Sequence, residues 1–193
     1  MSALNKLKSS GLASLYEATI LPRAQKKLRL IEPLLPKNVS VIDIGCGNGG
    51  LSKLLLEKGF VVKGADIIDN SYYEEVQPIL FDGRNLPVED KSFDVAMLIT
   101  VLHHTTFHKE LLLEAKRVAG KVVVMEDIFT HNLGKRITHF TDSLVNLEFK
   151  EHPHTNRSHQ GWIEFFDLMG LELTGVHFTR TLGYFRQALY ELK

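Results

Sequence analysis

The chain has 193 residues, of which 44% are hydrophobic and 24% charged, a composition typical of one globular domain. Its 23 Lys and Arg residues balance 23 Asp and Glu residues, which argues against a nucleic-acid or membrane binder that needs a positive field. The single cysteine, Cys46, excludes an intrachain disulfide and a multi-cysteine metal site. Residues 1–11 lack the apolar core of a signal peptide and no apolar run could span a membrane, so we expect a cytoplasmic protein.

The N-terminal region, residues 12–35, predicts one or two amphipathic helices, because apolar residues recur at helical spacing and Pro22 breaks or restarts the pattern. The same region is rich in lysine and arginine. These cations either form a solvated helix face or belong to a segment that folds over the site and guides an anionic acceptor.

The middle of the chain alternates between two patterns. Short apolar runs predict strands, and the segments with helical spacing between them predict helices that end at glycines. The strands are expected at 39–44, 60–66, 76–82, 93–100 and 121–128, and the helices at 51–58, ended by Gly59, and 107–118, ended by Gly120. Strands that alternate with helices predict a parallel sheet covered on both faces.

The C-terminal region has a different pattern. Ser158 is placed to cap a helix that runs through Met169 and stops at Gly170. Two strand-like runs follow, near 171–181 and 184–192, with a glycine between them, and they predict an antiparallel hairpin on the sheet edge.

A cluster of glycines, "GCGNGG" at 45–50, lies between the first predicted strand and the first helix of the sheet. Gly45, Gly47 and Gly50 match the G-x-G-x-x-G pattern of dinucleotide-binding loops. Glycine lets backbone N–H groups approach a ligand, and a helix N-terminus favours negative charge. A carboxylate suits this geometry as well as a pyrophosphate does.

Three acids narrow the choice of ligand. Asp43 precedes the loop and would repel a pyrophosphate but could hold a cationic amino group. Asp66 ends the second strand, where it can accept hydrogen bonds from ribose hydroxyls, and Asp82 ends the third. Each acid also has a structural interpretation: Asp43 could tie the loop to the first helix, Asp66 could cap the next segment, and Asp82 could form a turn with Gly83.

Together these motifs resemble the class I S-adenosylmethionine-dependent methyltransferases, in particular the small-molecule type 11 family. The resemblance runs from about Val39 to Asp127 and includes "DIGCGNG" (43–49), Asp66, Asp82, Leu86-Pro87, Phe93-Asp94 and "VLHH" (101–104). It implies an α/β fold with a doubly wound, Rossmann-like, seven-stranded mixed sheet and an antiparallel C-terminal strand. It further implies one domain over 1–193: N-terminal helices (1–36), cofactor-binding core (39–128), a substrate-side helical insertion (129–157), and the last helix with the edge hairpin (158–193).

The resemblance also implies how S-adenosylmethionine, and its product S-adenosylhomocysteine, would be bound. The loop residues Gly45, Cys46, Gly47 and Gly49 would cradle the methionyl part, with Asp43 and the backbone of Ile99 and Thr100 facing its amine. Asp66, next to Ile67, would bind the ribose, and Asp82 would accept the adenine amino group while the N–H of Gly83 reaches the ring.

The acceptor is expected to be a small molecule whose identity the sequence does not give. A base is optional in this chemistry; if one is used, His104 and His152 are the candidates, because neutral imidazole titrates near working pH. Packing or a helix-start role remains open for the histidine pair 103–104. No metal site is expected, since the H-x-H at 152–154 has no recognisable third ligand. The helical part of 129–157 either pads the sheet or forms a lid over the acceptor.

Two other functions stay open: a protein that binds S-adenosylmethionine without turnover, and a nicotinamide-dependent oxidoreductase, against which Asp43 argues. No N-P-P-[YFW] tetrapeptide of enzymes that methylate amino groups of nucleobases or glutamine follows the fourth strand. Because the charge is balanced and no apolar run could span a membrane, we expect neither a nucleic-acid nor a membrane partner, and the oligomeric state is open.

Overall fold

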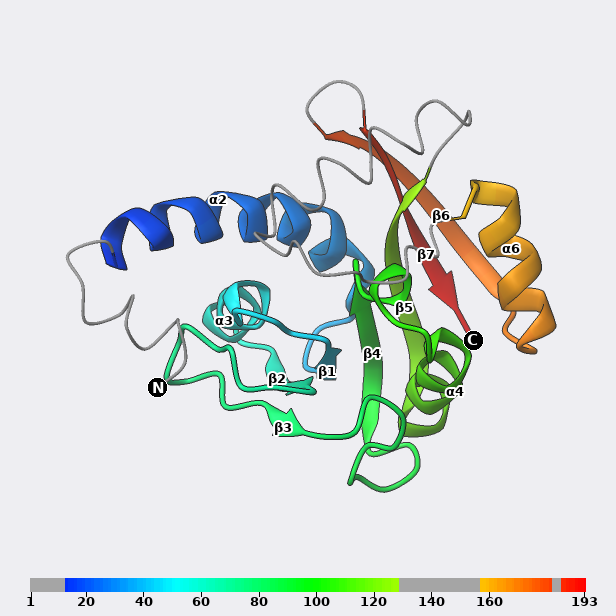
Figure 1. Ribbon diagram of the computed structural model, residues 1–193, viewed down its shortest axis with the longest axis horizontal. Coiled ribbons are helices and arrows are strands. Elements are labelled where there is room, and N and C mark those ends of the chain that lie inside the picture. Colours follow the sequence, from blue (N-terminus) through cyan, green and yellow to red (C-terminus); the bar gives the residue numbers. More distant parts are fainter. Residues whose placement is uncertain (1–12, 129–156, 182–184) are drawn as a thin grey trace.

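A computed structural model of the protein describes residues 13–128, 157–181 and 185–193. They form a seven-stranded sheet in the order β3-β2-β1-β4-β5-β7-β6, in which β7 runs antiparallel to both neighbours (Figure 1). The strands are β1 (Ser40–Ile44), β2 (Val61–Asp66), β3 (Ile79–Leu80), β4 (Phe93–Ile99), β5 (Ala119–Ile128), β6 (Leu173–Thr181) and β7 (Phe185–Leu192). The helices are α2 (Ala13–Ile31), α3 (Gly50–Glu57), α4 (His108–Val118) and α6 (His159–Leu168), with short 3-10 turns η1 (Glu32–Leu34) and η2 (Leu102–His104). The predicted doubly wound α/β fold is confirmed.

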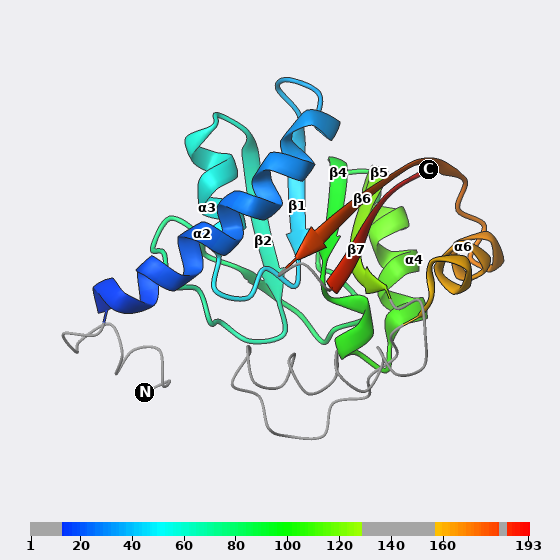
Figure 2. The same cartoon turned by 90° about the horizontal axis from the view of Figure 1, so that it is seen from above.

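Helices cover both faces of the sheet, α2 and α3 on one and α4 and α6 on the other (Figures 1 and 2). The side chains of the central strand β4 alternate between the two cores that these helices cover. Its residues Met97 and Ile99 join the core under α2 and α3, whereas Ala96 and Leu98 join the core under α4 and α6. Since successive side chains point to opposite faces, a strand buried on both sides must be apolar throughout.

Helix α2 is continuous from Ala13 to Ile31 and contains Pro22, so the prediction that Pro22 breaks or restarts it is wrong. A proline inside a helix costs about 3 kcal/mol because it removes a hydrogen bond. The opposing effect is burial: Ile20, Ala24, Leu28 and Ile31 all lie in the core on one face of the helix. Each fully buried large apolar side chain contributes about 1.5–3 kcal/mol, which together exceeds the cost of the proline.

Two other predicted boundaries are wrong. β3 is limited to Ile79–Leu80, which pair with the end of β2, instead of 76–82; the preceding Pro78 has no N–H to donate to a ladder. Gly120 does not end α4, because that helix stops at Val118 and Gly120 lies inside β5. The helix end is held by Lys91, whose ammonium donates to the carbonyls of Lys116 and Ala119.

The C-terminal predictions are confirmed. The Ser158 hydroxyl accepts a hydrogen bond from the N–H of Gly161 at the start of α6, and Gly170 follows the helix with a φ of +66°. β6 and β7 then pair as an antiparallel hairpin. β7 inserts next to β5, so that β6 forms the edge. The predicted helical insertion lies outside the described residues, apart from Arg157.

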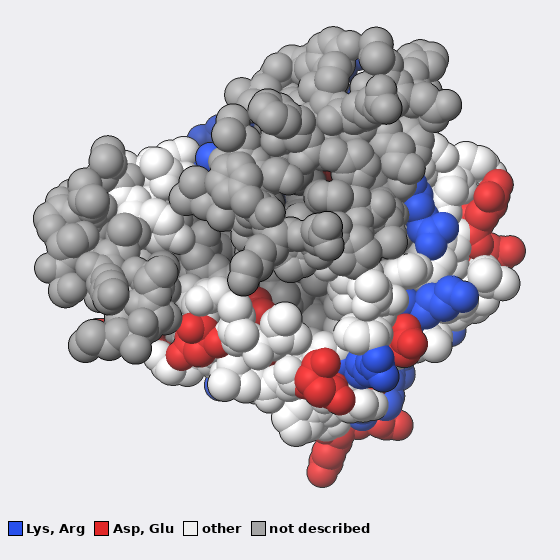
Figure 3. All heavy atoms as spheres, viewed as in Figure 1, with Lys and Arg blue, Asp and Glu red and all other residues white. Residues whose placement is uncertain are grey.

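Positive and negative side chains are mixed on the face shown in Figure 3, where Lys and Arg lie beside Asp and Glu. The described part of this face therefore presents no broad field of one sign. No helix among the described residues is both long and apolar enough to cross a membrane.

Candidate active site

The predicted site residues meet at the carboxyl edge of the sheet. Register explains this: Ile44 of β1 pairs with Ala65 of β2 and with Leu98 of β4, and Ile99 pairs with Met125 of β5. Parallel strands in register end at the same level, so the segments that follow β1, β2 and β4 start side by side. Residues far apart in sequence thus share one site.

The glycine loop after β1 is fixed by backbone hydrogen bonds. The N–H groups of Gly45 and Cys46 donate to the carbonyl of Ala65 over 2.7 and 3.2 Å, and Gly49 donates to Cys46 over 2.9 Å. Gly45, Gly47 and Gly49 have φ angles of +77°, +54° and +76°. Other residues adopt this left-handed region only at a cost, so the conformation of the loop requires glycine.

The glycines differ in what surrounds them. A Cβ at Gly45 would lie 2.6 Å from Val101, at Gly49 2.8 Å from the Ser71 hydroxyl, and at Gly50 2.6 Å from Ile20. A Cβ at Gly47 would meet no described atom within 4 Å. Three of these glycines are therefore enclosed by the protein itself, and Gly47 is the one that borders open space.

Asp66 lies next to this open space. Its carboxylate accepts hydrogen bonds from the N–H of Gly47 over 2.8 Å and from the N–H of Ile67 over 2.7 Å. The Ile67 side chain is 61% exposed although it is large and apolar. It lies 3.3 Å from the position of a Cβ on Gly83, so it connects the end of β2 with the turn after β3.

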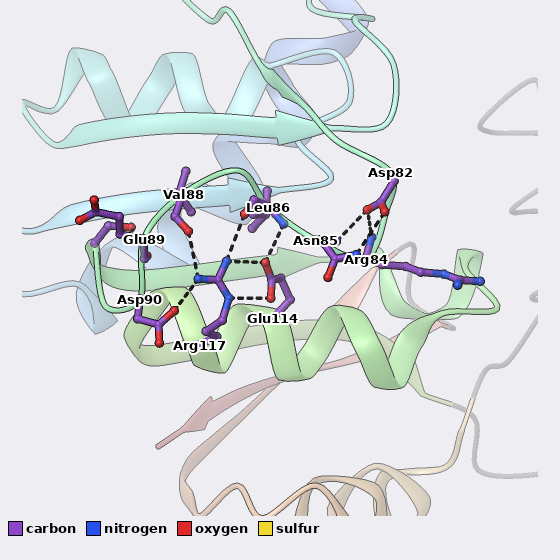
Figure 4. A network of polar contacts seen from close by, with 10 residues as sticks. Asp82, Arg84, Asn85, Leu86, Val88, Glu89, Asp90, Glu114 and Arg117 are labelled. Atoms are coloured by element: carbon purple, nitrogen blue, oxygen red, sulfur yellow. Dashed lines mark hydrogen bonds and ion pairs between the residues drawn. The ribbon is translucent and has the colours of Figure 1, made fainter.

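Asp82 organises that turn, as its structural interpretation predicts. One carboxylate oxygen accepts from the N–H groups of Arg84 and Asn85 over 2.8 and 2.7 Å, and the other accepts from the Asn85 amide over 3.2 Å (Figure 4). These donors, the backbone ones foremost, hold the pKa of Asp82 below its ordinary value. The side chain is exposed, so its oxygens are also accessible to an outside donor.

An ion pair on α4 secures the rest of the turn (Figure 4). Glu114 accepts from the N–H of Leu86 over 2.6 Å, and the Arg117 guanidinium bonds Glu114, Asp90 and the carbonyls of Leu86 and Val88. The sequence pattern alone does not indicate this role of Glu114 and Arg117. Their spacing of three residues indicates a pair on a helix, but nothing local indicates the loop that the pair holds.

Asp43 is buried, with 3% of its surface exposed, and its carboxylate accepts a hydrogen bond of 2.6 Å from the hydroxyl of Ser52 on α3. Burial raises the pKa of Asp43 to about 6, against the lowering effects of Ser52 and the Lys27 charge. This contact ties β1 to α3, as the structural interpretation of Asp43 predicts. The same carboxylate supplies negative potential beneath the glycine loop.

Thr100 follows β4 with a φ of +61°, an unusual conformation for a β-branched residue. Its N–H donates to Met125 over 2.7 Å, and its hydroxyl donates to the carbonyl of Ile99 over 2.6 Å. The same hydroxyl accepts from the ammonium of Lys27, on α2, over 3.0 Å. Lys27, one of the cations of the N-terminal region, therefore contacts the end of β4, as the alternative of a segment folded over the site predicts.

Comparison with known proteins agrees with this geometry. Residues 42–123 match the family model described as a methyltransferase domain. The chain is 28% identical over 152 residues to a sterol 4-C-methyltransferase of Caenorhabditis elegans, an alignment that covers 69% of this chain and 46% of the worm enzyme. It thus spans less than half the length of that relative. The cofactor-binding core of the chain is therefore similar to that of methyltransferases.

Solved structures share the fold at low identity. A Thermotoga maritima methyltransferase, described as a possible histamine N-methyltransferase, aligns with a TM-score of 0.69 and 19% identity over 94% of this chain and 97% of its own. The [4+2]-cyclase SpnF aligns with a TM-score of 0.65 and 12% identity over 88% and 79% of the two chains. One fold therefore accompanies proteins with different named activities.

The residues at the carboxyl edge fit the methyltransferase cofactor, S-adenosylmethionine. Open space borders Gly47, where an amino-acid chain can approach the backbone, and the carboxylate of Asp66 lies beside it. The exposed apolar surface of Ile67 lies between Asp66 and Gly83, as an adenine ring requires. These features suit the cofactor's methionyl, ribose and adenine parts in turn.

The histidine pair of the predicted acceptor side lies in η2, at the end of β4. His103 is buried and its Nδ1 pairs with Glu126 of β5, whose carboxylate also accepts from the N–H groups of Val101 and Leu102. The His104 ring packs on that of His103 with centroids 4.0 Å apart. Glu126 therefore fixes the turn that carries His104. His152, the other predicted base, lies outside the described residues.

The contacts of Cys46 and Arg157 indicate structural roles. Cys46 packs against Gly64, and burial together with the charges of Asp43 and Asp66 raises the pKa of its thiol, so it stays protonated at neutral pH. Arg157 contacts His108 of α4 over 3.2 Å and lies over the ring of Phe165, joining α6 to α4. No set of three metal-ligating side chains occurs among the described residues.

Proposed function

We propose that this protein transfers a methyl group from S-adenosylmethionine to a small-molecule acceptor. The observation that carries the proposal is the open space at Gly47, in a loop whose other glycines are enclosed by the protein. Gly59 has equally open surroundings, but only the opening at Gly47 lies beside the Asp66 carboxylate at the carboxyl edge of the sheet. The sterol acceptor named for the worm relative supports an acceptor of small-molecule class.

Each part of the cofactor has a proposed partner. The loop Gly45–Gly49 and the backbone at Ile99 and Thr100 would contain the methionyl part, with Asp43 providing negative potential for its ammonium. Asp66 would accept from the ribose hydroxyls, Asp82 from the adenine amino group, and Ile67 and Gly83 would contact the ring.

The cofactor supplies a methyl group that its sulfonium already makes electrophilic. The protein must therefore mainly align the acceptor with that carbon and exclude water. If the accepting atom carries a proton, we assign its removal to His104, held in η2 by the Glu126–His103 pair. His152 remains the second candidate for this step.

The test measures binding of S-adenosylhomocysteine by calorimetry. We expect the wild type to bind and Gly47→Val to lose binding, because the side chain fills the space that the ligand needs. Gly59→Val is the matched control: Gly59 has a φ of +85° and equally open surroundings, but it lies after α3. Gly59→Val should bind normally, and equal loss in both variants would refute a ligand at Gly47.

Asp66→Ala tests the ribose assignment separately. Loss of a hydrogen bond to a charged group costs about 1.5–3 kcal/mol, roughly a ten- to hundredfold loss of affinity. An unchanged dissociation constant in a folded variant would remove Asp66 from the binding site.

A second function, cofactor binding without methyl transfer, stays open because proteins of this fold carry different named activities. It predicts that S-adenosylhomocysteine never forms from S-adenosylmethionine with any acceptor pool, which mass spectrometry can follow. Titration with a nicotinamide dinucleotide tests the oxidoreductase alternative.

A further inference from the structure

The N-terminal helix α2 reaches the cofactor side of the sheet (Figures 1 and 2). Its buried residues Ala24 and Leu28 belong to the core shared with α3, and the Lys26 ammonium donates to the carbonyl of Arg180 in β6 over 3.0 Å. Lys27 is therefore held in place from both sides. Its ammonium lies against the Thr100 hydroxyl at the end of β4.

Acidic residues lie near the Lys27 ammonium, but none of the described carboxylates contacts it directly. Asp43, Glu126 and Asp127 all act on it electrostatically, yet burial outweighs them and lowers the pKa of Lys27. Among the described residues, no carboxylate forms an ion pair with it within 4.0 Å. Lys27 is half-buried, and a cation that is partly removed from water without a contacting anion is costly. A ligand carboxylate would offset this cost.

The strained backbone of Thr100 is a second, independent feature that points to a ligand. A β-branched residue at a φ of +61° is strained, and such strain is concentrated at ligand sites. Here the strained residue presents its hydroxyl to Lys27, at the strand end that faces the methionyl part of the cofactor in the proposed function. That part carries one ammonium and one carboxylate. The buried acid Asp43 and the cation Lys27 match these two charges.

We propose that Lys27 binds the carboxylate of the cofactor's methionyl part, and that α2 is thereby part of the cofactor site. This inference rests on the proposed function. It makes Lys27 a binding residue that recognises the end of the cofactor remote from the adenine. An anionic group on the acceptor is the competing partner, and the experiment separates the two.

The experiment compares S-adenosylhomocysteine with its decarboxylated analogue, which keeps the amine and lacks only the carboxylate, by calorimetry. We expect the wild type to bind S-adenosylhomocysteine about tenfold or more tightly than the analogue. Lys27→Met should lower the affinity for S-adenosylhomocysteine to near that for the analogue, and change the analogue's affinity by less than about twofold. Arg29→Met, an exposed cation on the same helix, is the matched control and should change neither.

Two measurements guard against misfolding. Without ligand, Lys27→Met should melt at the same or a higher temperature than the wild type, since it removes a half-buried charge that has no contacting anion. Lys27→Arg should recover part of the preference for the carboxylate. The assignment would be overturned if Lys27→Met lost affinity equally for both ligands, or for neither. It would also be overturned if the variant changed only the KM of the acceptor. Failure of the wild type to bind either ligand would instead refute the proposed function.

Discussion

The glycine loop at 45–50 and the turn at 82–90 both border the proposed cofactor, but they are built in different ways. The loop is held by backbone hydrogen bonds and by close packing against Val101, Ser71 and Ile20. The turn is held by side chains: the Asp82 carboxylate accepts from the N–H groups of Arg84 and Asn85, and Arg117 of α4 donates to the carbonyl of Leu86. The loop thus depends on the absence of side chains and the turn on their presence.

This difference predicts different tolerance to substitution. In the loop, a side-chain atom added at Gly45, Gly49 or Gly50 must displace a packed neighbour, so substitutions there should lower the stability. A substitution at Gly47 meets no neighbour and should mainly affect ligand binding. In the turn, most polar contacts lie near the surface, where water replaces a lost partner at small cost. Four predictions test the comparison, from the largest expected effect to the smallest.

Gly45→Ala should cause the largest loss of stability. Its Cβ would lie 2.6 and 2.8 Å from the methyl groups of Val101, and its φ is +77°. Backbone strain and overpacking together cost about 2–4 kcal/mol. Gly47→Ala pairs with it and should cost only about 1–2 kcal/mol, because it adds backbone strain without a clash. Urea unfolding measures both, and equal losses would contradict the division between enclosed and open glycines.

Asp43→Asn should stabilise the protein at neutral pH. The pKa of Asp43 is about 6 in the folded protein and 3.8 ordinarily, so the folded state binds this proton more tightly. The contribution of Asp43 to stability is thus greatest below about pH 3.8 and is lost as the pH rises through about 6. Replacing the carboxylate should add on the order of 1–3 kcal/mol at pH 7.5 and little at pH 4.

The check on Asp43 is urea unfolding of both proteins across this range of pH. A variant less stable than the wild type at pH 7.5 would mean that Asp43 is compensated by partners stronger than Ser52. The expected gain would coexist with weaker cofactor binding, because the loop would lose its negative potential.

Arg117→Met should destabilise the turn moderately. It removes the guanidinium that bonds Leu86, Val88, Asp90 and Glu114, and leaves the Glu114 carboxylate nearly buried. Because Arg117 is itself about one-third exposed (side chain 32%), we expect a loss of about 1–2 kcal/mol. Glu114→Gln with Arg117→Met should recover part of it. Thermal unfolding of the three variants tests this, and a double variant worse than the single one would contradict it.

Asp82→Ala should have the smallest effect on stability, because the carboxylate is exposed and its donors can turn to water. The melting temperature should stay close to that of the wild type. Affinity for S-adenosylhomocysteine should fall less than in Asp66→Ala, since the ribose contact involves an acid that also fixes Gly47. A larger loss than in Asp66→Ala would reverse the ranking of the two acids.

Several features of the fold could be predicted because their causes are local. Apolar runs predicted the strands around β1 and β4, and Ser158 and Gly170 marked the two ends of α6. Predictions failed where a distant contact outweighed a local signal. Pro22 signals a break, but the burial of one face of α2 against α3 keeps the helix continuous.

The candidate site divides in the same way. The loop glycines, Asp66 and Asp82 could be found because their types and spacing follow strand ends. Lys27 could not, since its contact with Thr100 joins residues 73 positions apart, and a lysine on an amphipathic helix is usually solvated. Glu126 was missed for the same reason, because it acts on a histidine 23 positions away.

The sequence by itself determined the order of strands and helices, the glycine loop and the acids at the strand ends, because apolar periodicity and backbone freedom are properties of neighbouring residues. Only the tertiary structure decided which glycine borders open space, that Asp43 is buried against Ser52, and that α2 brings a lysine to the cofactor side. These depend on burial and on electrostatic surroundings, and both arise only when segments distant in the chain are packed together.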